Sequence, residues 1–269
     1  MGFRHSDFQF YHHIWDEYLL TDQYLIDLKQ KHIDTFCEYN QDKSVETQQC
    51  EFPTKVGQVE VNVMRGKIFE KATVSTICAT VTIPGRDYES TIQWLGVQAF
   101  PANPLAPRFM GVYEHVSEIG KEHTPGYYDI YPATPFEEDR VYAQKEMEEV
   151  AKKHGRSVEA LAEGYKRMFQ VKEVGSGVGY GVGMAFPPEE ENFDYFHDAS
   201  STMFDVYFAL VGKRKDTKFS PEHLDAMFKQ RAEWVRFNFM DNRFFQGGIQ
   251  FGVPPECFML HFIPPVVKF

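Results

Sequence analysis

Ten histidines and four cysteines are the side chains of this sequence best suited to bind a metal ion or to attack a substrate. His12 and His13 are adjacent and cannot share one helical face, and neither His-x-x-x-His nor His-Glu-x-x-His occurs. The cysteines are scattered without Cys-x-x-Cys spacing: Cys37, Cys50, Cys78 and Cys257. Such spacing argues against structural zinc, a redox pair and a secreted disulfide framework. We therefore predict four buried thiols and no preformed metal site.

A run of glycines could cradle a phosphate group. Residues 175–183 read G-S-G-V-G-Y-G-V-G. No Gly-Lys-Ser/Thr follows the run, and no acidic residue stands where a βαβ unit would place a ribose ligand. A flexible loop or a closely packed backbone segment explains the run better than a nucleotide site does.

The charge of the chain excludes several classes of partner. The net charge is −11 and no basic run occurs, so binding to nucleic acid or to an anionic membrane surface is disfavoured. The N-terminus lacks the apolar segment of a signal peptide, and no stretch of eighteen apolar residues follows. We expect a cytoplasmic protein.

Length and composition bound the architecture. A chain of 269 residues favours one domain over residues 1–269, with one large core. Aromatic residues make up 16% of the chain, above the usual content. A core stacked with phenylalanine explains this better than an aromatic ligand pocket, which remains the alternative.

Hydrophobic periodicity predicts the elements that must position any site. We expect helices over residues 16–39, 136–154, 157–169, 192–211 and 220–231, and a loop over 40–49. Expected strands cover 56–64, 68–81, 91–100, 108–116, 234–240 and 258–263, and Arg65-Gly66-Lys67 forms a hairpin turn. His261 alternates within the last of these and is most simply a core histidine with satisfied hydrogen bonds. The order indicates an α+β protein with a large, mostly antiparallel sheet.

Several blocks in a fixed order resemble the oxygen-dependent coproporphyrinogen III oxidase family. Residues 68–75 (I-F-E-K-A-T-V-S) are similar to its F-E-K-A-G-V-S strand, and 103–107 (N-P-L-A-P) to its H-P-x-N-P-x-A-P connection. Residues 129–132 (D-I-Y-P) resemble its D-L-T-P segment, and 177–179 (G-V-G) its G-I-G loop. Residues 236–238 (R-F-N), with Arg243 beyond, and 258–265 resemble its E-F-N-L-x-Y-D-R and I-L-M-S-L-P-P segments.

The resemblance implies a fold, a partner and a reaction. It implies a broad antiparallel sheet sandwiched between helices, a homodimer and a pocket for a tetrapyrrole. It also implies that no metal or organic cofactor is needed: molecular oxygen is the co-substrate, two propionates lose carbon dioxide, and vinyl groups remain.

The family motif also implies a central residue, Asp129. A carboxylate at this position can accept several pyrrole N–H bonds and stabilise positive charge that develops on the ring. The alternative interpretation of Asp129 is a turn residue before Pro132.

The pocket departs from the family pattern. Phe100 stands at the histidine of H-P-x-N-P, and Ser176 replaces the arginine before G-I-G. On the strand that the family writes T-x-H-x-N-x-R, this chain has Arg108, Met110, Val112 and Glu114 on the same face. Tyr127 and Tyr128 replace glycines before the D-L-T-P position. Two arginines appropriate for the carboxylates of coproporphyrinogen are therefore lost, which favours a substrate with fewer carboxylates or another orientation.

We predict Asp129 as the catalytic residue, with a set of substrate-binding residues around it: Arg243, Arg108, Tyr128, Tyr131, Asn103, Met110 and Glu114. Arg108 could instead be a surface charge at a strand start, and Arg243 a turn residue or an ion-pair partner. Two functions follow from the resemblance. One is an oxygen-dependent oxidase of a porphyrinogen or related electron-rich ring. The other is a tetrapyrrole or aromatic-ligand binding protein without turnover.

Overall fold

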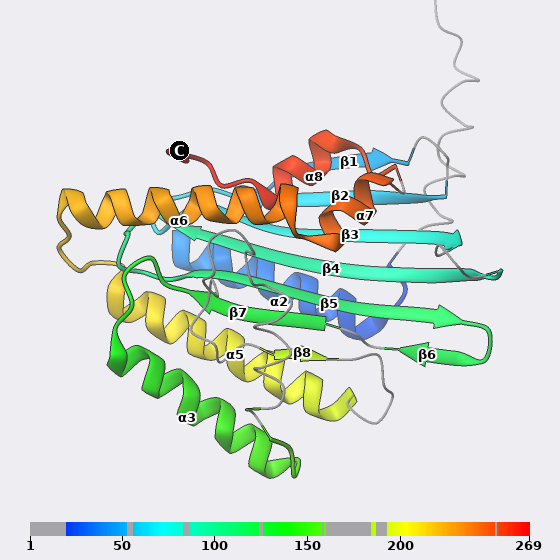
Figure 1. Ribbon diagram of the computed structural model, residues 1–269, viewed down its shortest axis with the longest axis horizontal. Coiled ribbons are helices and arrows are strands. Elements are labelled where there is room, and N and C mark those ends of the chain that lie inside the picture. Colours follow the sequence, from blue (N-terminus) through cyan, green and yellow to red (C-terminus); the bar gives the residue numbers. More distant parts are fainter. Residues whose placement is uncertain are drawn as a thin grey trace, which may run out of the picture.

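One antiparallel sheet forms the centre of the molecule (Figure 1). The computed structural model describes residues 20–52, 56–82, 87–123, 126–157, 159, 184–186, 193–250 and 252–269. Its strands are β1 (Glu46–Glu51), β2 (Gly57–Met64), β3 (Phe69–Thr82), β4 (Glu89–Pro101), β5 (Arg108–Glu118), β6 (Lys121–His123), β7 (Gly126–Tyr131) and β8 (Met184–Phe186). They lie in the order β1-β2-β3-β4-β5-β7-β8, with β6 paired to β5. Every described pairing is antiparallel.

Helices cover both faces of the sheet (Figure 1). On one face lie α6 (Pro221–Met240), α7 (Arg243–Gln250) and α8 (Pro255–Phe262). On the other lie α2 (Gln23–Asn40) and α5 (Phe193–Arg214), with α3 (Glu137–Lys153) packed against α5. Within the described ranges, no helix is long and apolar enough to cross a lipid bilayer. The α+β fold with a helix-sandwiched antiparallel sheet is thus confirmed.

Side chains alternate between the two faces of the sheet along each strand and form two separate hydrophobic cores, one on each face. On β5, Phe109 and Tyr113 pack with α2 and α5, whereas Met110 and Val112 pack with α6–α8. The first core is rich in contacting rings, for example Phe204 and Phe208, whose centroids lie 4.6 Å apart. This packing accounts for much of the high aromatic content.

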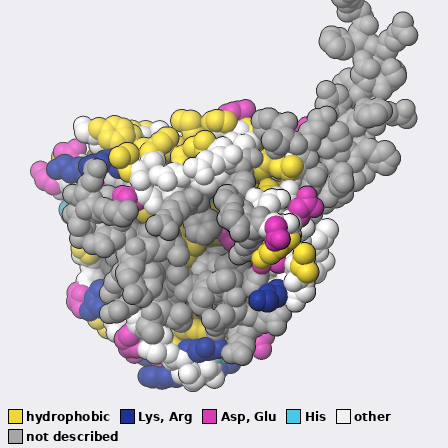
Figure 2. Space-filling view, turned by 45° about the vertical axis from the view of Figure 1, so that its right-hand side comes forward, with side chains coloured by type: hydrophobic (Ala, Val, Ile, Leu, Met, Phe, Trp, Pro, Cys, Tyr) yellow, Lys and Arg dark blue, Asp and Glu magenta, His cyan; other side chains and the backbone are white. Residues whose placement is uncertain are grey.

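Large apolar side chains also remain exposed in the C-terminal segment. Figure 2 shows hydrophobic side chains along its upper edge, the side on which Figure 1 has α6 and α8. The exposed members of this C-terminal apolar patch are Phe239, Met240, Ile249, Met259, Val266 and Phe269. A patch of this kind marks a surface suited to association with another chain.

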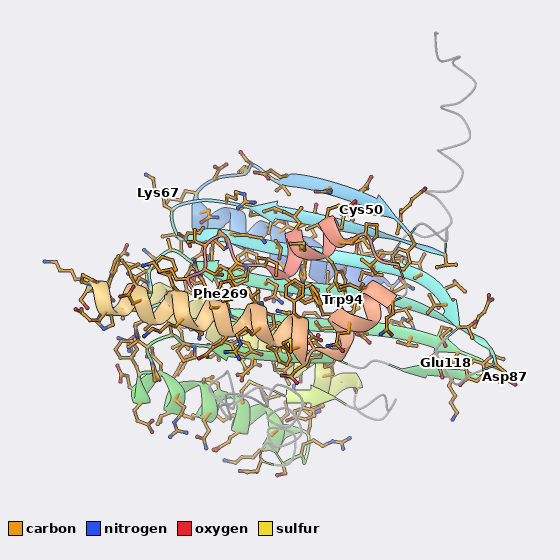
Figure 3. All side chains as sticks on the ribbon, turned by 45° about the horizontal axis from the view of Figure 1, so that its top comes forward. Cys50, Lys67, Asp87, Trp94, Glu118 and Phe269 are labelled. Carbon is orange, nitrogen blue, oxygen red and sulfur yellow. A yellow bond between two sulfur atoms is a disulfide. The ribbon has the colours of Figure 1, made fainter. Side chains whose placement is uncertain are left out.

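A disulfide joins Cys50 on β1 to Cys257 on α8, so the prediction of four thiols was wrong for these two residues. They are 207 residues apart, and only the folding of α8 across the sheet edge brings them together (Figure 3). Cys37 and Cys78 are buried free thiols, as predicted.

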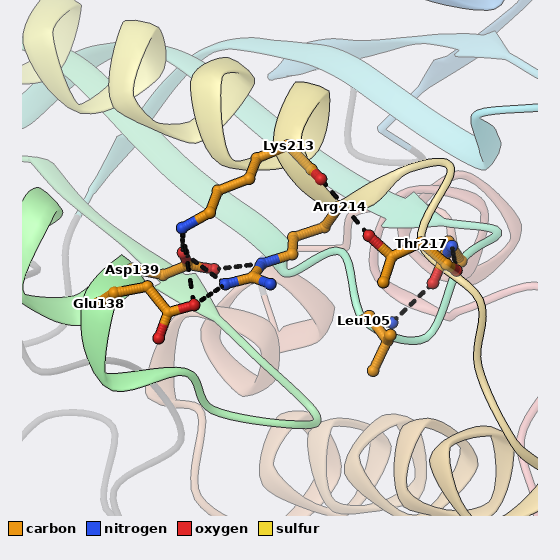
Figure 4. A network of polar contacts seen from close by, with 7 residues as sticks. Leu105, Glu138, Asp139, Lys213, Arg214 and Thr217 are labelled. Carbon is orange, nitrogen blue, oxygen red and sulfur yellow. Dashed lines mark hydrogen bonds and ion pairs between the residues drawn. The ribbon is translucent and has the colours of Figure 1, made fainter.

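An ion-pair network fixes α3 to α5 (Figure 4). The Asp139 carboxylate accepts hydrogen bonds from Arg214 Nε and Nη2, both at 2.8 Å, and from Lys213 Nζ at 2.6 Å. The Asp139 side chain is 1% exposed, and that of Arg214 10%. Glu138 adds a contact of 2.6 Å to Arg214 Nη2. Acidic residues in the first turn of α3 also suit the positive end of the helix dipole.

Most predicted elements are confirmed, and four segments differ. The expected loop 40–49 contains the start of β1, and Asp129 lies inside β7. Segments 234–240 and 258–263 were predicted as strands, but they belong to α6 and α8. Both are rich in closely spaced apolar residues, which fit periods of 2 and 3.6 almost equally well. The predicted 157–169 helix and the glycine run 175–183 lie mostly or wholly outside the described residues.

Candidate functional site

The pairing of β5 with β7 brings several predicted site residues together. Arg108 stands opposite Tyr131, and Met110 stands opposite Asp129. Directly opposite residues in a sheet point to the same face, so all four side chains face α6. Met110 and Tyr131 belong to the core beneath α6–α8, together with Trp234 of α6.

Asp129 is fully buried in this face, with 0% exposure. One oxygen of its carboxyl group, Oδ1, accepts a hydrogen bond from the backbone N–H of Ile130 at 2.7 Å. Burial raises the pKa of the neighbouring Tyr131 hydroxyl well above its usual value, and the nearby Asp129 carboxylate adds to this effect. The alternative interpretation of Asp129 as a turn residue was wrong, because it lies within a strand.

Arg108 is buried with 3% exposure, so the alternative interpretation as a surface charge was also wrong. Its guanidinium carbon lies 4.0 Å from the ring centroid of Trp234 and 4.2 Å from that of Tyr131. Its Nη1 donates a long hydrogen bond of 3.4 Å to Gln98 Oε1. Burial lowers the pKa of Arg108 to about 10.

One edge of the Arg108 guanidinium, formed by Nε and Nη2, is buried without a hydrogen-bond partner among the described residues. The amide Nε2 of Gln98 and the hydroxyl of Tyr131 are likewise buried without a partner there. The Nε and Nη2 atoms form the edge with which arginine binds a carboxylate through two parallel hydrogen bonds. The site therefore has the donors for a carboxylate close to the buried Asp129.

Glu114 lies further along β5 on the same face and lines an apolar cavity of about 280 Å³. Burial raises the pKa of its carboxyl group to about 8. Trp94 of β4 stands directly opposite Glu114 and also lines the cavity, beneath the C-terminal helices (Figure 3). Its ring occupies the space over Gly96, where a Cβ atom would lie 1.9 Å from the indole. This end of the face is therefore an apolar cavity with one acidic residue, whereas the other end carries the cationic Arg108.

Two predicted site residues lie apart from this face, and the side chain of a third is not described. Tyr128 packs into the opposite core with α5, and Asn103 donates to the backbone oxygens of Lys215 and Thr217 at 3.0 and 2.8 Å. Arg243 begins α7, and its side chain lies outside the described part of the structure. The structure thus brings together Arg108, Met110, Asp129 and Tyr131, with Glu114 at the far end of the same face.

Sequence reasoning missed the residues that α6 contributes. Trp234 and Phe237 lie on one side of α6 and close over the site. Their spacing of three residues is typical of one face of a helix, but it was not used because 234–240 was predicted as a strand. Gln98, on β4 beside Arg108, was also missed, and its alternation with the apolar residues Val97 and Ala99 could have identified it.

His261 lies in the core, as predicted, but on a helix, and the prediction of satisfied hydrogen bonds was wrong for Nε2, which is buried without a partner among the described residues. Its Nδ1 faces the hydroxyl groups of Ser75 and Thr73 at 2.7 and 3.1 Å. Burial lowers its pKa well below the usual value, so the ring is neutral. The contacts of Nδ1 with Ser75 and Thr73 link α8 to β3. Within the described residues, no group of three or more His, Cys, Asp or Glu side chains could hold a metal ion.

Comparison with known proteins assigns this arrangement to a family. A family model described as "Coproporphyrinogen III oxidase" matches residues 21–269. The oxygen-dependent coproporphyrinogen-III oxidase of Francisella tularensis subsp. novicida is 24% identical over 226 residues, covering 76% of this chain and 72% of that protein. The protein of that name from Francisella philomiragia is 25% identical over 227 residues, covering 75% and 71%. The match to the family model extends over nearly the whole sequence, and this chain belongs to the coproporphyrinogen III oxidase family.

Proposed function

We propose that this protein oxidises a porphyrinogen or a related electron-rich ring with molecular oxygen, without a metal or organic cofactor. The observation that carries the proposal is the presence of a buried carboxylate and a buried guanidinium on one sheet face. Asp129 and Arg108 stand at neighbouring positions of the β5–β7 ladder, and the Nε–Nη2 edge of Arg108 lacks a partner among the described residues. A porphyrinogen has both complementary groups, namely ring N–H donors and carboxylates.

The two charged residues have separate roles in this proposal. Asp129 accepts ring N–H bonds and stabilises the positive charge that develops as electrons leave the ring. Arg108 holds one carboxylate through two parallel hydrogen bonds, and Tyr131 lies against the guanidinium. In each oxidation a propionate releases carbon dioxide, two electrons and one proton and becomes a vinyl group. Oxygen accepts the two electrons with two protons, one of them from the medium, and leaves as hydrogen peroxide.

Access to these groups requires movement of the covering helix. Trp234 of α6 is fully buried over Arg108, and Asp129 is fully buried as well. Substrate therefore enters as α6 shifts away from this end of the sheet, and the aromatic residues close around the ring afterwards. Exclusion of water in the closed state strengthens the interaction of both charged groups with the substrate.

The test uses coproporphyrinogen III mixed anaerobically with the purified protein and then exposed to air. Product formation should be faster with the unchanged protein than with Asp129→Ala or the isosteric Asp129→Asn. Glu89→Gln, on the exposed end of β4, serves as the matched control and should retain full activity. Equal rates for the unchanged protein and both Asp129 variants would refute the role of Asp129.

A second function, binding of a tetrapyrrole or aromatic ligand without turnover, is supported by the apolar character of the site. Met110 and Val112 are fully buried at the positions where the related family motif has His and Asn. Titration with haem, coproporphyrin and a bilin should then give a saturable absorbance or fluorescence change, with no oxygen consumed in the first assay. No binding of any of the three below ~50 μM would refute this second function.

A homodimer is part of the proposal. The C-terminal apolar patch, with Met240, Met259 and Phe269 among its exposed residues, supports association of two copies. Light scattering should give twice the mass of 31.3 kDa, and Met240→Lys with Met259→Lys should yield monomers. A monomer at all accessible concentrations of the unchanged protein would refute it.

We further propose that residues 1–269 form a single domain. The one sheet carries helices from both ends of the chain, and α2 and α8 both contact β2 and β3. Chemical unfolding should follow a single transition by fluorescence and by circular dichroism. Two separate transitions would indicate two independent units.

A further inference from the structure

The cavity at Glu114 is separate from the predicted carboxylate clamp. Glu114 and Arg108 are six residues apart on β5, which places them ~20 Å from each other along the strand. The side chains between them on this face, Met110 and Val112, are fully buried in the core. A ligand in the cavity therefore has its own set of contacts.

Apolar surface makes up nearly all of the cavity lining. Aromatic side chains come from Phe52, Trp94, Phe258 and Phe262. Apart from Glu114, the remaining wall consists of aliphatic residues and glycines from β3, β4, β5, α7 and the α7–α8 connection. Among the described lining residues, Glu114 is the only polar one. A volume of about 280 Å³ is roughly twice that of the ~150 Å³ apolar cavities that accept benzene. The space suits a flat ligand of two fused rings.

Burial alone raises the pKa of Glu114, and no hydrogen bond to a described residue contributes to the shift. The residue is 8% exposed, and the indole of Trp94 stands directly across the β4–β5 ladder. Tyr127 on β7 lies near Glu114, and its pKa is raised by burial and by Glu114. Glu114 also borders a small second pocket, whose titratable lining residues are Asp22, Tyr24, His115 and His197. The described residues of β3, β4, α7 and α8 that line the larger cavity include no charged side chain. Glu114 therefore faces the cavity as a single acid amid aromatic surface.

The acidic side chain of Glu114 determines which charge a ligand of this cavity should carry. A carboxylate ligand would meet an acid and no cation, which disfavours it. An ammonium group would satisfy Glu114 with a charge-assisted hydrogen bond and could also lie over an aromatic face. The net charge of −11 further raises the local concentration of cations.

We propose that this cavity binds a primary amine carried on a flat, apolar body of about two rings, with its ammonium group at Glu114 and its rings against Trp94, Phe258 and Phe262. Binding of the cation favours the ionised form of Glu114. Because burial raises the pKa of the free carboxyl group to about 8, binding at pH 7 releases a proton.

Isothermal titration of the full-length protein with three indoles of similar shape tests the proposal. Tryptamine is the cation, 3-ethylindole the neutral analogue and indole-3-propionate the anion. We expect tryptamine to bind about tenfold or more tightly than 3-ethylindole, and indole-3-propionate most weakly. The heat measured at pH 7 in buffers of different ionisation enthalpy should report the released proton.

Two variants connect the result to the cavity. Glu114→Gln should abolish the preference for tryptamine and the proton release while retaining 3-ethylindole binding within about twofold. Ala79→Leu extends into the cavity and should weaken both ligands. Tryptamine binding should survive Arg108→Met, which separates this site from the proposed oxidase site. Equal or tighter binding of 3-ethylindole, or no tryptamine heat at ~1 mM, would each overturn the proposal.

Discussion

Replacement of Glu114 by glutamine should stabilise the protein increasingly as the pH rises. Burial raises the pKa of this carboxyl group from 4.5 to about 8. Below pH 4.5 the group is protonated in both the folded and the unfolded chain and has no effect on stability. Between 4.5 and 8 the unfolded chain ionises while the folded chain keeps the proton, so the free energy of unfolding falls as the pH rises.

The size of the effect follows from that difference in pKa. Each pKa unit corresponds to 1.36 kcal/mol, so a difference of 3.5 between 4.5 and about 8 gives a maximal loss of about 5 kcal/mol. At pH 5 the loss is below about 1 kcal/mol, and at pH 7 it is about 3 kcal/mol. Glutamine has nearly the same shape and does not ionise, so Glu114→Gln removes this dependence.

Urea unfolding at pH 5, 7 and 9 measures the prediction. The variant should exceed the unchanged protein by less than about 1 kcal/mol at pH 5 and by about 5 kcal/mol at pH 9. Glu89→Gln, at the exposed start of the neighbouring strand β4, is the control and should show no such trend. A difference between Glu114→Gln and the unchanged protein that stays constant from pH 5 to 9 would refute the buried, protonated state of Glu114.

Three further changes test other parts of the structure. Reduction of the Cys50–Cys257 disulfide should lower the free energy of unfolding by up to about 5 kcal/mol, since it closes a loop of 207 residues; unchanged urea midpoints with and without reductant would contradict this. Asp139→Asn should cost about 3 kcal/mol in urea unfolding because it leaves the 10%-exposed Arg214 side chain without its buried partner, and a loss below about 1 kcal/mol would argue against the network of Figure 4. Arg108→Met should leave stability equal or higher and weaken coproporphyrin binding about tenfold or more in fluorescence titration; a destabilised variant with unchanged affinity would argue against a ligand-binding role.

The sheet was largely predictable from local sequence. The strands over 57–64, 69–82, 89–101 and 108–118 each have clear alternation and are bounded by turn residues, so the expected ranges differ from the observed ones by few residues. α3 and the start of α6 were predictable from helix-start signals, including Ser220 followed by Pro221. These patterns depend only on residues close together in the chain, so they can be recognised in the sequence alone.

The long-range features were less accessible. The Cys50–Cys257 pair depends on where α8 crosses the sheet, and no spacing rule encodes that position. Segment 234–240 was predicted as a strand but is part of α6, and this helix places Trp234 over Arg108. The contact depends on how α6 packs on the sheet. The predicted shared face of Arg108, Met110, Val112 and Glu114 was correct, because alternation fixes it, but the burial of Arg108 required knowledge of α6.

The two ends of this face have opposite charge character, and this contrast bears on the substrate. The family motif resembled by β5 ends in arginine, whereas this chain has Arg108 at the start of the strand and Glu114 near its end. A substrate held at Arg108 then meets no second cation on β5, because Met110 and Val112 are fully buried and Glu114 lies ~20 Å away in its own cavity. A substrate with carboxylates on only one side fits this arrangement, and one with carboxylates all around does not. In competition assays, porphyrins with carboxylates on one edge should therefore bind more tightly than coproporphyrin, and Arg108→Met should remove the difference. An unchanged ranking in Arg108→Met would mean that Arg108 does not hold the substrate.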